Sequence, residues 1–424
     1  MSTESFLCQG KSENDRVIAL QFHAFPNWRK IRSIGNVVLH KMRKAHHLLS
    51  FGVENLRLLV LLLAMGSTAE AQTNSNPDRF VVTVLTNFSA WDVNGNGRLE
   101  AVEMNQALQN PSVKGDAAAA VATLKWLLDS PQGRLSHGVG REFFQGHETA
   151  MKKLASIFKA SQKRIEETKG QPVFLAEGPA LFGFKQSYHG DCYLIAAVAA
   201  VAARDPKRIS GMIEAVAGAT NFSVRFPDGL VVTTPVLTEG ELAMPGASAD
   251  NGLWLRMLEK GWGVRKMLRM EGKINSEIDP CDVIDGPIPH DITLEAMTGH
   301  RAMRYDLGGS DGKVTALNEL RAALQRGMAG RHPMTADVVE SSVPGIVEHH
   351  AYAVLDYDTT ADVISLWNPL AIDFMPEGAE GRKNGYKTVG GKFVMPLVDF
   401  RTVFEDLKVE TTQTKSAEDK TWIH

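Results

Sequence analysis

The chain has 424 residues, of which 44% are hydrophobic and 22% charged, and its net charge is -3. These values are typical of a soluble globular protein with two to three domains, and they give no argument for nucleic-acid or membrane-surface binding. Only three cysteines occur, Cys8, Cys192 and Cys281, which excludes a disulfide framework.

Residues 1–71 are predicted to contain an export signal. The stretch NLRLLVLLLAMGSTAEAQT has a basic flank, an apolar run at 58–65 and a small-residue ending at Ala71, the layout of a secretory signal peptide cleaved after Ala71. The apolar run is too short to span a bilayer, so no stable membrane anchor is expected; the alternative is a buried core helix. Because the preceding basic region is long, Met42 is an alternative start, with 1–41 an upstream extension. The mature chain would be exported, either secreted or periplasmic.

Residues 79–167 are predicted to form a small all-helical module. Apolar residues recur at helical spacing over 79–91, 101–108, 114–129 and 149–167. The segment TKGQPVF at 168–174 breaks this pattern and is the expected domain boundary.

The sequence DVNGNGRLEAVE at 92–103 fits the twelve-residue EF-hand calcium loop. Calcium takes six to eight oxygen ligands, which explains the regular spacing of short oxygen-bearing side chains. Gly97 would make the sharp turn and Leu99 would point inward. The alternative is a polar turn rich in Asn and Gly. The expected ligands are Asp92, Asn94, Asn96, the Arg98 carbonyl, Glu100 through a water, and Glu103.

Calcium loops of this type usually occur in pairs, and LDSPQGRLSHGV at 128–139 is the candidate partner. Gly133 and Leu135 match the turn and the inward apolar position. The segment lacks the first Asp and the last Glu, so it is expected to bind no metal. At the calcium concentration outside cells, the single site is expected to be structural rather than regulatory.

From residue 172 the pattern becomes mixed helix and strand. Strands are expected at 221–226 and 229–236, helices at 251–265 and 315–328, then three antiparallel strands within 350–358, 361–369 and 391–400, and a short helix at 398–406. Helices first and strands later predict an α+β fold.

Cys192 stands where polar residues meet an apolar helix, CYLIAAVAAVAAR, which is expected to be buried on all sides. Asp191 is a preferred N-cap residue. The helix N-terminus favours an anion, so we expect a lowered thiol pKa and a reactive thiolate. Gly190 would let a substrate backbone approach closely. The alternative is that Cys192 is an inert core residue.

A thiolate nucleophile needs an imidazole and a group that orients it. His350 starts one predicted strand and Asn368 ends the next, so a hairpin would place them side by side. His349 is the competing base, but strand alternation turns one of the two imidazoles away. Gln186 and the Cys192 N–H would supply donors for the oxyanion.

Together these residues resemble the calpain family of papain-like cysteine proteases. The family's Q…GDCW segment is similar to 186–197, its GHAY segment to 349–352, and its NP segment to Asn368-Pro369. Further similarities lie at 253–263, 294–299 and 391–404. The resemblance covers about 172–407 and implies a two-lobed fold with Cys192 on one lobe, and His350 and Asn368 on the other. It also selects His350 as the base.

Three positions depart from the family pattern. Tyr193 replaces the Trp after the cysteine, His349 replaces the Gly before the histidine, and Leu370 replaces the Trp of NPWG, which shields the catalytic pair from water. These departures put substrate specificity and rate in question more than the chemistry.

The resulting prediction is an exported cysteine endopeptidase with a Cys-His-Asn triad, acting on protein or peptide substrates without a catalytic cofactor. Residues 408–424 would be a C-terminal tail. The alternative is a catalytically silent, calcium-stabilised protein-binding module. The oligomeric state is not predicted.

Overall fold

The computed structural model describes residues 77–129, 137–145, 148–175, 178–179, 181–186, 189–215, 218–245, 252–271, 274–275, 277–285, 290–308 and 314–414. The chain separates into two compact units, 1–57 and 58–424, and every described residue lies in the second. The predicted signal region lies outside the described residues. Among those that are described, no helix is both long and apolar enough to cross a membrane.

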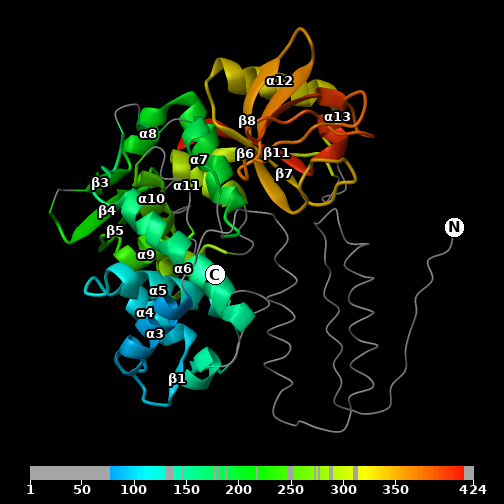
Figure 1. Ribbon diagram of the computed structural model, residues 1–424. Helices are drawn as coiled ribbons and strands as arrows, with labels where there is room; N and C mark the ends of the chain where they lie inside the picture. Colours follow the sequence, from blue (N-terminus) through cyan, green and yellow to red (C-terminus); the bar gives the residue numbers. More distant parts are fainter. Residues whose placement is uncertain are drawn as a thin grey trace, which may run out of the picture. The chain divides into compact units, whose positions relative to one another are not determined.

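The N-terminal part is a helical module that spans 77–168 (Figure 1). Its helices pack around apolar side chains such as Phe80, Phe88 and Phe158, all nearly inaccessible to solvent. The elements are α3 (Pro77–Trp91), β1 (Arg98–Leu99), α4 (Ala101–Gln109), α5 (Gly115–Asp129), β2 (Val139–Gly140), η1 (Arg141–Gln145) and α6 (Glu148–Thr168).

The two short strands of the module pair with each other. Strand β1 pairs antiparallel with β2, and Leu99 lies opposite Val139, the last residue of the predicted partner loop. Gly133 and Leu135 lie outside the described residues. Both Leu99 and Val139 are buried, because the backbone pairing turns each apolar side chain into the core of the module.

The next part of the chain surrounds a buried helix, α7 (Cys192–Arg204), which matches the predicted apolar helix. All of its residues from Cys192 to Ala202 are buried. Other elements of this region are η2 (Leu181–Gly183), α8 (Pro206–Ser210), α9 (Glu239–Ala243), α10 (Trp254–Glu271), η3 (Pro280–Val283) and α11 (His290–Thr298). A three-stranded sheet joins β3 (Ile213–Ala215), β4 (Asn221–Arg225) and β5 (Val231–Pro235).

A six-stranded antiparallel sheet forms the last part, in the order β10-β9-β8-β7-β11-β6 (Figure 1). Helix α7 packs against its strand β8, and this contact brings the start of the helix to the start of the strand. The elements are β6 (His300–Asp306), α12 (Leu317–Ala329), β7 (Met334–Val338), β8 (His350–Asp358), β9 (Val363–Trp367), β10 (Lys392–Pro396), α13 (Leu397–Val403) and β11 (Asp406–Thr414).

The mixed composition of helices and strands confirms the α+β class in its coarse form. The predicted tail at 408–424 was wrong over 408–414, because strand β11 lies inside the sheet between β7 and β6. Its residues Asp406–Glu410 are buried, and the pairing with two distant strands has no local signature in the sequence.

Candidate active site

Cys192 is the first residue of α7, and Asp191 occupies the N-cap position before it. The predicted side-chain cap is absent, because the Asp191 carboxyl makes no hydrogen bond to the helix backbone. It is instead fully buried beside the Glu259 carboxyl of α10. Burial, and then the Glu259 charge, raise the pKa of Asp191 well above its usual range.

The Cys192 thiol is 9% exposed and lies against strand β8. The backbone N–H groups of Ala351 and Tyr193 donate hydrogen bonds to the sulfur, which favours the thiolate. Burial has the larger effect and raises the pKa of Cys192 to about 11. The expected lowering of this pKa was therefore wrong: burial of the thiol raises the cost of ionising it, and the charges of Asp191 and Asp337 add to that cost.

The predicted hairpin joins His350 to Asn368. Strands β8 and β9 pair antiparallel, with His350 at the start of the first and Asn368 directly after the second. His350 Nε2 lies 2.8 Å from Asn368 Oδ1, and both residues are buried. Ala351, the residue after His350, donates its backbone N–H to the Cys192 sulfur, so the start of β8 lies at the thiol.

The orientation of the Asn368 amide fixes the tautomer of His350. Asn368 Oδ1 also accepts the backbone N–H of Leu370 at 2.9 Å, so this atom is an acceptor and the oxygen faces the imidazole. His350 Nε2 must then carry the hydrogen. Its Nδ1 keeps the lone pair, which is the group that can take a proton from a thiol.

His350 is the first residue of β8, whereas His349 lies in the bend before the strand, so strand alternation does not apply to this pair. His350 is buried and His349 is exposed. The backbone of His349 has a φ of 48°, and that of Ala371, three residues after Asn368, has a φ of 52°. Residues other than glycine seldom adopt this left-handed conformation, so strained positions flank both members of the His–Asn pair.

Gln186 is tied to the same region through its backbone and its side chain. Its N–H donates to the Pro369 carbonyl at 2.7 Å, which joins the segment before Cys192 to the residue after Asn368. Its side-chain Nε2 donates to the His189 carbonyl at 2.7 Å. An amide nitrogen carries two hydrogens, so the second is available in principle for a substrate oxyanion.

Three residues near Cys192 were not singled out from the sequence. Asp285 accepts the Gly190 N–H at 2.6 Å, and Ile284 accepts the Tyr193 hydroxyl at 2.7 Å. Asp337 of β7 affects the thiol through its charge. Each lies about ninety or more residues from Cys192 in the chain, and no local motif marks it.

The calcium-loop residues form a turn closed by their own side chains. Asp92 Oδ2 accepts the Gly97 N–H, Asn94 Oδ1 accepts the Asn96 N–H, and Asn96 Oδ1 accepts the Arg98 N–H. The two Glu103 oxygens accept the N–H groups of Asn94 and Glu100. These bonds bring all six predicted ligand residues into one loop between α3 and α4.

One atom of this loop points to a cation. Asp92 Oδ1 is buried and has no hydrogen-bond partner within the described part of the chain. A buried carboxylate oxygen without a partner is costly, and a hard cation would satisfy it. The residues therefore fit calcium. Among the described residues no group of three His, Cys, Asp or Glu is placed to hold a metal, so a site here needs the amide and carbonyl oxygens as well.

Both described cysteines, Cys192 and Cys281, are free, so they do not form a disulfide with each other. Cys281 lies in η3 and lines a cavity of about 30 Å³. Such a volume holds one or two waters and no substrate.

Comparison with known proteins agrees with this geometry. The profile of the calpain family cysteine proteases matches residues 143–410, which is more than half of the chain and includes Cys192, His350 and Asn368. The match also includes η1 and α6 of the helical module. No curated protein matched the sequence. The chain belongs to the calpain family of cysteine proteases.

Proposed function

We propose that this protein is an exported cysteine endopeptidase in which Cys192, His350 and Asn368 form the catalytic triad. Family membership indicates cysteine peptidase activity and, with it, protein or peptide substrates. The observation that carries the assignment of residues is the 2.8 Å bond between His350 Nε2 and Asn368 Oδ1, directly beside the strand residue that contacts the Cys192 sulfur. We propose a two-lobed arrangement, with Cys192 on one lobe and the imidazole–amide pair on the other.

The proposed reaction begins with proton transfer from Cys192 Sγ to His350 Nδ1. The sulfur attacks the peptide carbonyl carbon as the proton leaves, because a thiol with a pKa of about 11 carries little preformed thiolate at neutral pH. Asn368 holds the imidazole and stabilises the imidazolium. His350 then returns the proton to the leaving amine, and water hydrolyses the thioester in a second step.

The carbonyl oxygen needs donors as it becomes an oxyanion. The Cys192 N–H is one candidate, because the first residue of a helix has no intrahelical acceptor for its N–H. The Gln186 side-chain amide is the other, held by its bond to the His189 carbonyl. Gly190 is exposed, and a Cβ there would meet no atom closer than 3.8 Å, so the substrate backbone has room to approach.

Calcium is proposed as a structural ligand of the loop at 92–103. Asp92, Asn94, Asn96, the Arg98 carbonyl, Glu100 and Glu103 would hold it, and the unpartnered Asp92 Oδ1 supports this assignment. Bound calcium would hold α3 and α4 together through their shared loop and would take no part in the reaction.

The test is cleavage of an unfolded protein substrate by the chain from residue 72, wild type against Cys192→Ala, with calcium and with a chelator. We expect cleavage by the wild type only, in both conditions. Loss of cleavage in the chelator would make calcium a regulator. Cleavage by neither protein would favour the silent binding module. Export is tested separately, by sequencing the N-terminus of the protein recovered outside the cell, where a start at Gln72 is expected.

A further inference from the structure

The segment 277–285, which we call the connector, contacts two parts of the molecule at its two ends. It contains the single turn η3 and packs on α10. The connector packs tightly on α10 at Gly263. A side chain there would not fit, because its Cβ would lie 1.8 Å from the Pro280 carbonyl oxygen. The connector is therefore held as a fixed element between its two ends.

The first end of the connector is bound to the helical module. Asn105 and Gln109 of α4 donate side-chain bonds to the carbonyls of Glu277 and Ile278 at 3.1 and 3.3 Å. Helix α4 is also the helix that carries Glu103, the last residue of the calcium loop.

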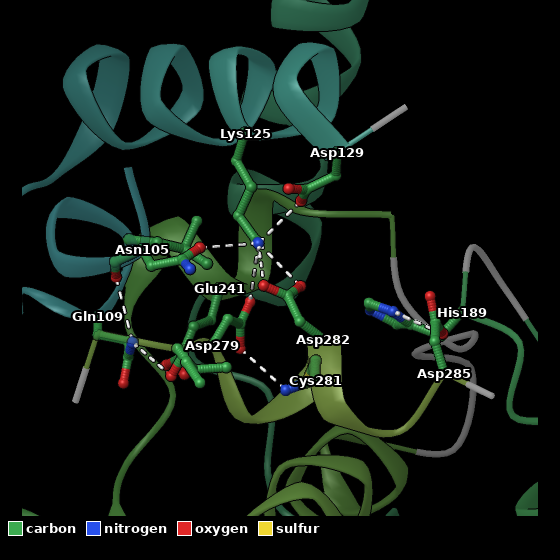
Figure 2. A network of polar contacts seen from close by, with 12 residues as sticks. Asn105, Gln109, Lys125, Asp129, His189, Glu241, Asp279, Cys281, Asp282 and Asp285 are labelled. Carbon is green, nitrogen blue, oxygen red and sulfur yellow. Dashed lines mark hydrogen bonds and ion pairs between the residues drawn. The ribbon is translucent and has the colours of Figure 1, made fainter. Parts of the chain in front are cut away.

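Lys125 of α5 strengthens this attachment (Figure 2). Its side chain is 1% exposed, and its Nζ lies 2.6 and 2.8 Å from the two Asp282 oxygens and 2.8 Å from Asn105 Oδ1. Asp129 is a further partner at 2.8 Å. A buried ammonium surrounded by carboxylates and an amide oxygen fixes the groups around it, since moving any of them leaves a charge unpaired.

The second end of the connector is bound to the residues on either side of Cys192. Asp285 Oδ1 accepts the Gly190 N–H at 2.6 Å and lies 3.5 Å from His189 Nδ1. The Ile284 carbonyl accepts the Tyr193 hydroxyl at 2.7 Å, and Trp262 Nε1 donates to the same hydroxyl at 3.3 Å. Figure 2 shows Asp285 beside His189, in a contact that lies apart from the group of contacts around Lys125.

From these contacts we propose that Asp285 is a positioning residue for the Cys192 segment, and that the connector transmits the position of the helical module to the active site. The proposal rests on the proposed role of Cys192. Asp285 fixes Gly190, and Gly190 with Asp191 sets where α7 begins and where the sulfur and the Cys192 N–H point. The helical module is thereby part of what holds the catalytic geometry.

The proposal predicts a kinetic effect without a large loss of stability. The Asp285 side chain is 51% exposed, so its removal leaves no buried cavity. A displacement of the nucleophile by a fraction of an ångström slows the chemical step and leaves substrate binding nearly unchanged.

The experiment compares the full chain as wild type, Asp285→Ala and Asp285→Asn. One readout is kcat and KM for an unfolded protein substrate. The other is the rate of Cys192 alkylation by chloroacetamide, quantified at the Cys192 peptide by mass spectrometry. We expect Asp285→Ala to lower kcat by about 10- to 100-fold with KM and melting temperature nearly unchanged, and to change the alkylation rate. Asp285→Asn keeps an acceptor for the Gly190 N–H and should restore both.

A second pair of variants tests the module end. Lys125→Met combined with Asp282→Asn removes the Lys125–Asp282 ion pair and leaves neither of these two residues charged, while the Asn105 and Gln109 bonds to the connector remain. It should reproduce the alkylation change of Asp285→Ala. The matched control is Asp116→Ala on the same helix, which removes bonds to Arg79 and Gln162 but touches no connector residue, and it should alkylate like the wild type.

The outcomes separate the two proposals. Unchanged kcat and alkylation in Asp285→Ala would overturn the positioning role, as would an Asp285→Asn protein as impaired as Asp285→Ala. If no protein cleaves substrate while alkylation changes in Asp285→Ala and recovers in Asp285→Asn, the positioning role stands and the endopeptidase function fails.

Discussion

The calcium loop and the Cys192 segment are both short turns before a helix, yet their hydrogen bonds come from different distances along the chain. The bonds that close the calcium loop join residues two to nine positions apart. Those that hold the Cys192 segment join Gly190 to Asp285, 95 residues away, and Tyr193 to Ile284, 91 residues away. A loop closed by its own side chains can form early and alone, whereas the Cys192 segment takes its shape only when the surrounding core has folded.

The largest effect on the Cys192 segment is expected from removing the proposed catalytic base. We expect His350→Ala to lower kcat for an unfolded protein substrate by about 10²- to 10⁴-fold, because general-base catalysis is lost. The matched control is His349→Ala, which alters the exposed histidine directly before His350 and should retain activity. Equal losses in the two variants would contradict the assignment of His350.

The next largest effect is the pH dependence of Cys192 reactivity, which follows from the burial of the thiol. Because burial raises the pKa of Cys192 to about 11, the thiolate fraction should rise about tenfold per pH unit throughout pH 6–9. The chloroacetamide rate at the Cys192 peptide should follow this slope. A rate that is already level above pH 6 would instead indicate a thiolate–imidazolium pair in the resting protein.

The calcium loop should respond to substitutions that leave the Cys192 segment unchanged. Calcium at 100 times its dissociation constant should stabilise the wild type by about 2.7 kcal/mol. In Glu103→Gln, which replaces the bidentate carboxylate by an amide, most of this calcium-dependent increase in melting temperature should disappear. The calcium-free melting temperature should fall by less, because one of the two N–H groups bound by Glu103 loses its acceptor. If calcium does not change the melting temperature of the wild type, the proposed calcium site is contradicted.

The smallest effect concerns the strained backbone beside the active site. Replacing Ala371 by glycine relieves a left-handed backbone that costs about 1–2 kcal/mol, partly offset by the greater chain entropy of glycine. We expect a net gain of about 1 kcal/mol in the free energy of unfolding, measured by urea denaturation. Ala353→Gly, in the regular part of β8, is the control and should destabilise.

What the sequence predicts well is what short-range patterns determine. The bounds of α7, the β8–β9 hairpin with His350 and Asn368 at its open end, and the four helices of the module all follow from periodicity and capping residues. The expectation that one of the two histidines faces away, with His350 selected by the family resemblance, agrees with a buried His350 and an exposed His349. These features need no knowledge of distant residues.

What the sequence does not predict depends on distant contacts. Strand β11 was interpreted as a tail because its insertion between β7 and β6 leaves no local signal. Asp191 was expected to cap α7, but its carboxyl lies beside Glu259 of α10. The pKa of Cys192 was expected to fall because helix position is visible in a sequence, whereas the depth of burial is not.

The contact between the helical module and α9 would hold these two parts together even if the chain between them were cut. Ala243 and Met244, at the end of α9, belong to the module's own apolar core, and Arg164 of α6 donates to the Ala243 carbonyl at 2.8 Å. Lys169 and Gly170, which follow α6, form an exposed turn. A trypsin cut after Lys169 would therefore leave two fragments that remain associated and migrate together until a denaturant separates them. The two fragments would behave as one folded protein although the chain between them is cut.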